Sequence, residues 1–330
     1  MRSREIRLAA RPRGTPTEAD FDLTEVDVAD PADGELLIRN EVMSVDPYMR
    51  PRMNDAPSYV PPFEVGEPLA GGAVGRVAAS RHPDYAEGDW VLSMLGWREF
   101  ARSDGTGIRK LDADRAPPST ALGVLGMPGL TAYVGLLDIG QPKEGETVFV
   151  SGAAGAVGSI VGQIAKLRGC RVIGSAGSSE KVAWLRELGF DAAFDYKQTP
   201  PREGLRGEAV DVYFDNVGGD HLEAAIGAAN PFARLVECGM VSRYNDERAE
   251  PGPRNMAMIV PKRLLLKGFI VRDHTDRARD FYRDMGEWVR DGKVRYRETY
   301  VDGIENAPRA LLGLFGGENI GKMLVRLRSA

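Results

Sequence analysis

The stretch Thr147–Leu167, TVFVSGAAGAVGSIVGQIAKL, decides the fold of this chain. It opens with the apolar run Val148–Val150, which is typical of a buried parallel strand. A glycine-rich turn follows at Gly152–Gly158, and apolar residues then recur at helical spacing until Gly169, a natural helix stop. Because a pyrophosphate site needs a tight turn that leads straight into a helix, this order predicts a dinucleotide-binding unit.

The glycine turn departs from the usual G-x-G-x-x-G pattern at its first position. Ala153 stands where the first glycine is expected, while Gly155 and Gly158 fill the other two positions. A glycine turn between a strand and a helix can also be a plain structural turn without a ligand. The flanking strand and helix favour the nucleotide-binding interpretation.

The second predicted strand, Arg171–Ser175, indicates which cofactor binds. An NAD enzyme carries an acidic residue at this strand tip, about 20 residues past the glycines, to bind the ribose 2′-hydroxyl. Here the tip reads SAGSSEK, with small hydroxyl residues before Lys181. A lysine there attracts a 2′-phosphate, which favours NADP, although an inward-turned Glu180 would favour NAD and the pair could simply open a solvated helix.

Composition excludes several classes of function. The chain has 330 residues, 43% hydrophobic and 28% charged, which is enough for two globular domains. Its net charge of −5 argues against a nucleic-acid partner. No 18-residue apolar run predicts a membrane span, and the N-terminus lacks the apolar segment of a signal peptide.

Cysteine and histidine usage points to a reduced compartment and to no metal site. Cys170 and Cys238 are expected to be reduced packing residues near core strands, which indicates a cytoplasmic protein. The histidines show no metal-ligand spacing; they are His82, His221 and His274.

The pattern along the chain predicts an α/β protein with two domains. Residues 1–122 read as short strands broken by Gly, Pro and Asp, which predicts a mostly β, barrel-like domain. Residues 123–300 alternate strand and helix, which predicts a doubly wound parallel sheet of the Rossmann type. The final segment, residues 301–330, is expected to return to the first domain. The six strands predicted for the second domain lie at 148–150, 171–175, 192–196, 210–216, 234–238 and 264–271.

Several stretches in order along nearly the whole chain carry a family resemblance: VDPYMR (45–50), MPGLTAYVGL (127–136), the segment 150–182, FDNVGG (214–219), CGMVSRYN (238–245) and ENIGKMLV (318–325). With these motifs the chain resembles the zinc-independent medium-chain dehydrogenases/reductases, in the branch of leukotriene 12-hydroxydehydrogenase/prostaglandin reductase, alkenal double-bond reductase and curcumin reductase. The resemblance implies a GroES-like β domain beside the Rossmann domain, and a homodimer.

The resemblance also implies a reaction, the NADPH-dependent reduction of the carbon–carbon double bond of an α,β-unsaturated ketone or aldehyde. Zinc enzymes of the superfamily place a catalytic cysteine where this chain has Ser44–Asp46, and two cysteines cannot build their structural zinc site. Direct carbonyl reduction is disfavoured without a Lewis acid, whereas conjugate addition of hydride needs only hydroxyl donors for the enolate oxygen.

The family pattern assigns site residues position by position. Tyr244 is expected to donate to the enolate oxygen alongside the ribose 2′-hydroxyl, and Tyr48 to wall the pocket and serve as a further donor. Each tyrosine could instead be a core aromatic with a satisfied hydroxyl. The expected cofactor contacts are Ala153, Ala154, Gly155, Ala156, Val157, Gly158, Ser178, Lys181, Tyr196, Asn216, Cys238, Gly239, Tyr244, Phe269, Ile270, Val271 and Asn319.

Two features leave the substrate open. Met53–Pro62 is richer in proline than the mammalian pattern, so it is expected to shape the substrate mouth and eicosanoid specificity is not transferred. Arg243 favours an anionic substrate or is a surface charge. Two alternative functions remain: a zinc-independent NADPH:quinone reductase, and a crystallin-like protein that holds NADPH without turnover.

Overall fold

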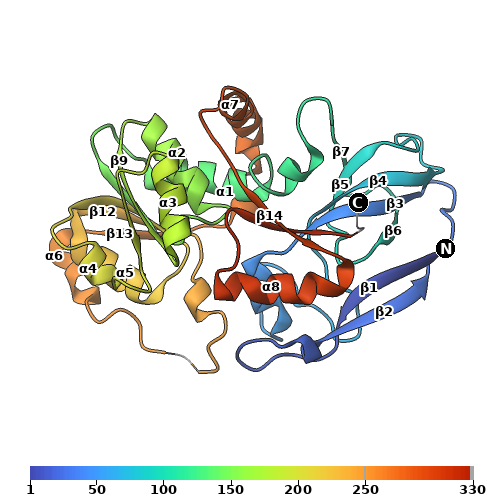
Figure 1. Cartoon of the computed structure of the whole chain (residues 1–330), viewed down its shortest axis with the longest axis horizontal. Helices are drawn as coiled ribbons and strands as arrows, with labels where there is room; N and C mark the ends of the chain where they lie inside the picture. The colour runs from blue at the N-terminus through green and yellow to red at the C-terminus, as the bar shows by residue number, and fades with distance from the viewer. Residues whose placement is uncertain (249, 328–330) are drawn as a thin grey trace. The chain divides into compact units, whose positions relative to one another are not determined.

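The computed structural model describes residues 1–248 and 250–327, and the chain folds into two compact units (Figure 1). The first unit contains Met1–Leu122, Glu298–Asn319 and the chain from Met323 onward. The second contains Gly123–Arg297 and Ile320–Lys322. None of the described helices is both long enough and apolar enough to cross a membrane.

The first unit is built on antiparallel strands. β1 (Arg2–Leu8) pairs with β2 (Phe21–Asp27), and a seven-stranded sheet runs in the order β14-β15-β3-β4-β5-β7, with β6 also paired to β3. Its apolar core gathers Met43, Trp97 and Leu311, the last from α8 (Ala307–Gly316). The remaining elements are β3 (Leu36–Ser44), β4 (Ala73–Ser80), β5 (Trp90–Ser93), β6 (Phe100–Ser103), β7 (Arg109–Lys110), β14 (Glu298–Asp302), β15 (Lys322–Arg326), and the 3-10 turns η1 (Glu18–Asp20), η2 (Pro47–Met49), η3 (Pro51–Met53), η4 (Pro118–Leu122) and η9 (Ile304–Asn306).

The second unit confirms the expected doubly wound parallel sheet. Six parallel strands run in the order β10-β9-β8-β11-β12-β13, the strand order of a Rossmann fold. The strands are β8 (Thr147–Val150), β9 (Arg171–Ala176), β10 (Ala192–Asp195), β11 (Val210–Asp215), β12 (Ala229–Glu237) and β13 (Leu265–Gly268). The helical elements are α1 (Met127–Val134), the π turn η5 (Gly135–Gly140), α2 (Gly158–Leu167), α3 (Ser179–Glu187), α4 (Pro201–Gly204), α5 (Gly219–Ala228), η6 (Val241–Arg243), η7 (Met256–Met258), α6 (Ile259–Lys262), η8 (Val271–Arg277) and α7 (Ala278–Arg290).

Both faces of the parallel sheet are buried, because successive side chains of a strand point to opposite faces. Val148 and Val150 join the core that holds α1, α2, α3 and α7, whereas Phe149 joins the core that holds α5. Because the six strands are parallel, their carboxyl ends form one edge of the sheet, which is where ligands of this fold bind.

One expectation needs correction. The sixth strand covers Leu265–Gly268 and not the whole of 264–271, because the chain leaves the sheet at Phe269, whose ring packs edge-on against Phe214 with ring centroids 6.5 Å apart. The helix α1 was not among the elements predicted from the sequence. Pro128 stands in its first turn, where a proline costs no hydrogen bond.

Candidate active site

The glycine turn after β8 is too tight for side chains. Gly152 has a φ of +57°, in the left-handed region. A Cβ atom on Gly158 would lie 2.6 Å from the carbonyl oxygen of Gly152, so only glycine fits where α2 begins. Ala153 is fully buried and its N–H donates to the carbonyl of Ser175 at 2.9 Å, which locks the turn against β9. The local sequence thus places a helix N-terminus at the carboxyl edge of the sheet.

This turn fits a pyrophosphate. In the part of the chain that the structure describes, no carbonyl accepts a hydrogen bond from the N–H of Ala156 or Val157. Open N–H groups at the start of a helix bind phosphate and are favoured by the helix dipole. The N–H of Gly321 donates to the carbonyl of Ala154 at 2.8 Å, which brings the segment after Asn319 beside the turn. Asn319 itself lies in the loop between α8 and β15 and is half-buried.

The tip of β9 gathers several of the residues expected to hold a 2′-phosphate. Ser178 caps α3, and its hydroxyl accepts from the N–H of Lys181 at 3.3 Å. Tyr196 follows β10, and its hydroxyl oxygen lies 2.9 Å from where a Cβ on Gly177 would stand. Lys197 reaches the same place, with its Cε atom 3.3 Å from that point. No acidic side chain ends this strand.

The charges around the tip of β9 favour binding of a doubly negative group such as a 2′-phosphate. Burial lowers the pKa of Lys181, the positive charge of Lys197 lowers it further, and Glu180 partly opposes both. A phosphate would relieve this repulsion between two lysines. Glu180 is exposed on α3 and does not end β9. Sequence reasoning missed Lys197, although its position directly after Tyr196 at a strand end was a usable signal.

A buried carboxylate organises the next strand end. Asp215 is fully buried at the end of β11, and its backbone carbonyl accepts from the N–H groups of Cys238 and Gly239, both at 3.0 Å. Its side chain ties β8, β11 and the turn after β11 together. Oδ1 accepts four hydrogen bonds, from the hydroxyls of Ser151 at 2.9 Å and Tyr213 at 2.7 Å and from the N–H groups of Val217 and Gly218, both at 2.8 Å.

Asn216 and Cys238 flank this carboxylate. The amide of Asn216 donates to the carbonyl of Ser151 at 2.8 Å, so the side chain is held toward the glycine turn. Burial, together with the charges of the nearby Asp215 and Glu237, raises the pKa of Cys238 to about 12. The thiol is therefore protonated at neutral pH and is not a nucleophile.

Tyr244 lies in the segment after β12. Its hydroxyl oxygen is 3.1 Å from where a Cβ on Gly239 would stand, and Asn216 borders the same glycine. The structure thus brings Tyr244, Gly239 and Asn216 together at the carboxyl edge of the sheet. Arg243 is held within this segment, because it pairs with Asp246 at 3.3 Å and donates to the carbonyl of Pro251 at 3.3 Å.

The segment Phe269–Val271 occupies the same edge, directly after β13. All three residues are half-buried. A Cβ on Gly135 would lie 2.6 Å from the ring of Phe269, so this ring seats directly on the π turn η5. Ligands of this fold bind outside the carboxyl ends of the strands, so the segment is placed where it could contact a bound ligand.

Tyr48 belongs to the first unit, whereas most of the other expected site residues belong to the second. It lies in η2, with its ring against the apolar core. Burial raises the pKa of its hydroxyl strongly, and Asp46 adds to the shift. No hydrogen bond among the described residues involves this hydroxyl, so it is able to donate a hydrogen bond to a ligand. Asp46 itself accepts a short hydrogen bond from Ser44.

The loop expected to shape the substrate mouth is anchored at both ends. The Nε of Arg52 donates to the carbonyl of Pro61 at 3.0 Å, and its guanidinium stacks 4.0 Å above the ring of Phe63. The N–H of Phe63 returns to the carbonyl of Arg52 at 2.7 Å. Tyr59 near the tip of the loop is 47% exposed. The loop is therefore a fixed wall beside η2 with an aromatic tip.

No group of three His, Cys, Asp or Glu side chains gathers tightly enough to hold a metal ion within residues 1–248 and 250–327. The two units together define a nicotinamide-dependent oxidoreductase. Residues 4–111 match a family described as the N-terminal domain of oxidoreductase, and residues 156–289 match one described as zinc-binding dehydrogenase.

Close relatives narrow the class. The chain is 48% identical to the NADPH-dependent curcumin reductase of Escherichia coli over 99% of its own length and 97% of the relative's. It is 40% identical to the NADP(+)-dependent 2-alkenal reductase of Nicotiana tabacum over 94% of each chain. The NADPH complex of CurA from Vibrio vulnificus superposes with a TM-score of 0.94 at 46% identity, covering 99% of this chain and 100% of the other. The chain belongs to the zinc-independent branch of the medium-chain dehydrogenases/reductases.

Proposed function

We propose that this protein is an NADPH-dependent reductase that saturates the carbon–carbon double bond of α,β-unsaturated ketones and aldehydes. The observation that carries the proposal is the corner at the tip of β9. No acidic residue ends this strand, Lys181, Lys197 and Tyr196 gather at its tip, and a glycine turn with open N–H groups follows the neighbouring strand β8. The relatives' NADPH-dependent reduction of curcumin and of 2-alkenals supports the same cofactor and substrate class.

The chain offers a complete set of groups for this cofactor. Ala156 and Val157 would bind the pyrophosphate, and Ser178, Lys181 and Tyr196 would bind the 2′-phosphate with Lys197. Asn216, Cys238–Tyr244 and Phe269–Val271 would line the nicotinamide end. When bound, NADPH supplies the hydride that the β-carbon of the substrate accepts.

The chemical role of the protein is to stabilise the charge that then collects on the substrate's carbonyl oxygen. The Tyr244 hydroxyl donates a hydrogen bond to that oxygen, and a donor placed where charge develops lowers the barrier. Tyr48 lines the substrate pocket and is a second hydroxyl able to donate. In this proposal residues 1–122 and 301–330 bind the substrate and residues 123–300 bind NADPH.

We further propose that the protein acts as a homodimer in the cytoplasm. β13 is the edge strand of the parallel sheet, and an unpaired edge is a template for pairing with another chain. Apolar side chains near this edge are exposed: Val260 by 78%, Phe232 by 63% and Leu265 by 51%. A second copy would cover them. Two free cysteines are consistent with a reducing compartment.

A direct assay tests the function. Purified protein is mixed with NADPH or NADH and with a simple enone, an enal and a quinone, and NADPH absorbance is followed. We expect fast NADPH oxidation with the enone and enal and weak activity with NADH. Turnover of quinones alone would identify a quinone reductase, and tight NADPH binding without any turnover would identify a binding protein.

A further inference from the structure

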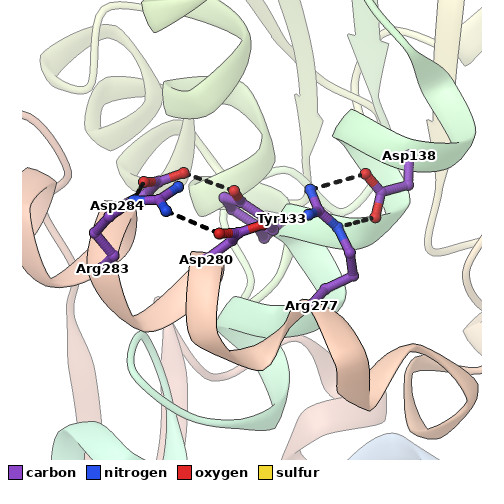
Figure 2. A network of polar contacts seen from close by, with 6 residues as sticks. All are labelled: Tyr133, Asp138, Arg277, Asp280, Arg283 and Asp284. Atoms are coloured by element: carbon purple, nitrogen blue, oxygen red, sulfur yellow. Dashed lines mark hydrogen bonds and ion pairs between the residues drawn. The ribbon is translucent and has the colours of Figure 1, made fainter.

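An ion-pair network joins α7 and η8 to α1 and the π turn η5, outside the residues assigned so far (Figure 2). Arg277 at its centre binds Asp138 with two nitrogens, at 2.8 Å from Nε and 3.2 Å from Nη2. Its third nitrogen donates to Asp280 at 2.6 Å. A two-pronged guanidinium–carboxylate pair is the most directional ion pair available to a protein.

The network is partly buried and reinforced by an aromatic ring. Arg277 is 29% exposed and Asp138 is 27% exposed, so solvent screens this pair less than a fully exposed one. The guanidinium of Arg277 lies 5.6 Å from the centre of the Tyr133 ring, and the Tyr133 hydroxyl donates to Asp284 at 2.6 Å. Burial and the hydrogen bond to the Asp284 carboxylate raise the pKa of Tyr133 to about 12, so this hydroxyl keeps its proton.

The π turn η5 contacts both ends of the segment 269–277, which follows β13. At the start of this segment, the ring of Phe269 seats against Gly135. At its end, Arg277 grips Asp138 of the same turn. Between these two anchors the backbone is irregular, because η8 contains a non-helical residue, His274, with φ −119° and ψ 34°. The Phe269 ring also meets the His274 ring, with centroids 6.3 Å apart.

We infer that Arg277 is a positioning residue for the nicotinamide end of the cofactor, acting through Phe269–Val271. The inference rests on the proposed function, in which this segment lines the nicotinamide. An irregular segment that is fixed before binding pays no ordering cost when the ligand arrives. The clamp on Asp138 fixes it from one end while Gly135 fixes it from the other. π turns are rare, and they occur frequently at functional sites.

The test separates the two ends of the cofactor. Calorimetry gives the dissociation constants of NADPH and of 2′-phospho-ADP-ribose, which lacks the nicotinamide, for the wild type and for Arg277→Met. We expect the variant to bind NADPH roughly 3- to 30-fold more weakly and 2′-phospho-ADP-ribose within about 2-fold of wild type. Arg283→Met is the matched control, because Arg283 lies on α7, the helix that follows η8, is 63% exposed and, among the described residues, forms ion pairs only with Asp280 and Asp284 of its own helix.

Asp138→Asn serves as a second variant that removes the charge while keeping the shape, and it should show the same selective loss even where Arg277→Met folds poorly. Unchanged NADPH affinity in both variants, or equal loss of both ligands, would overturn the inference. Failure of the proposed function looks different: the wild-type protein would then turn over neither the enone nor the enal, whatever its affinity for NADPH.

Discussion

Asp215 and Glu237 are register partners on the neighbouring parallel strands β11 and β12, and their carboxyl groups are buried beside each other. Oδ2 of Asp215 and both carboxyl oxygens of Glu237 lack a hydrogen-bond partner among the described residues. Burial raises the pKa of Asp215, and the four hydrogen bonds that Oδ1 accepts oppose this shift by stabilising the carboxylate. Burial raises the pKa of Glu237 to about 8, and the charge of Asp215 contributes to the shift. A proton on Glu237 is the donor that this pair needs.

This pair predicts a pH-dependent stability. The pKa of Glu237 is higher in the folded protein than in the unfolded chain, where it has the ordinary value near 4.5. The folded protein therefore holds a proton that the unfolded chain has lost, and the free energy of unfolding falls as pH rises from about 4.5 to 8. The glutamine of Glu237→Gln can donate a hydrogen bond to Asp215 and does not titrate. Over this pH range the free energy of unfolding of the variant should therefore fall by a few kcal/mol less than that of the wild type.

Urea unfolding at several pH values checks this prediction, with Glu144→Gln at an exposed position as the control. Parallel pH profiles for the wild type and Glu237→Gln would show that Glu237 is ionised in the folded protein.

Lys181 predicts cofactor selectivity. Lys181→Ala removes one of the two cations at the tip of β9, so the KM for NADPH should rise roughly 10- to 100-fold while the KM for NADH changes by less than about 2-fold. Steady-state kinetics with both cofactors measure the effect. Lys166→Ala is the control, because Lys166 pairs with Asp191 at 2.8 Å on the outside of α2. Equal losses for NADPH and NADH would remove the phosphate-binding role.

Tyr244 predicts a loss in the chemical step. Tyr244→Phe should lower kcat roughly 10- to 1000-fold, because the hydroxyl that stabilises the enolate oxygen is gone. The dissociation constant of NADPH should stay within about 2-fold of wild type, since the aromatic ring remains. Tyr282→Phe on the exposed side of α7 controls for a general effect of losing a phenol. A rate equal to wild type would assign the enolate to another donor.

Gly158 predicts a steric effect on both folding and binding. In Gly158→Ala the new methyl group would lie 2.6 Å from the Gly152 carbonyl oxygen and 2.8 Å from the Cα of Ala153, both backbone atoms. We expect a loss of roughly 1–3 kcal/mol in the free energy of unfolding together with weaker NADPH binding.

The matched control is Gly286→Ala in α7, where a Cβ meets nothing within 4 Å. That variant should gain up to about 1 kcal/mol, because alanine is the better helix former. Equal stability of Gly158→Ala and wild type would show that the glycine turn can relax.

The strands and helices of the second unit could be predicted because their signals are local. The apolar run at Val148–Val150 and the helical spacing after Gly158 need no knowledge of the rest of the chain. The error at the sixth strand has the same origin. Apolar residues continue past Gly268 to Val271, but Phe269 packs against Phe214 and Gly135 instead of extending the sheet.

The polar groups that organise the site depend on distant parts of the chain. Arg277 and Asp138 are 139 positions apart, and the local sequence around either residue does not predict the ion pair. Asp215 meets Glu237 only through the register of β11 on β12, and Lys197 meets Lys181 only because β10 lies beside β9. Such pairs follow from the three-dimensional fold, whereas the hydrophobic periodicity of the sequence predicts only the individual strands and helices.

The most direct measurement follows one hydrogen atom. NADPH carrying deuterium at both C4 positions of the dihydronicotinamide is mixed with the protein and a simple enone, and the product is examined by NMR and mass spectrometry. The account predicts a saturated ketone with deuterium at the β-carbon. Deuterium at the carbonyl carbon of an allylic alcohol, or a ketone without deuterium, would contradict it.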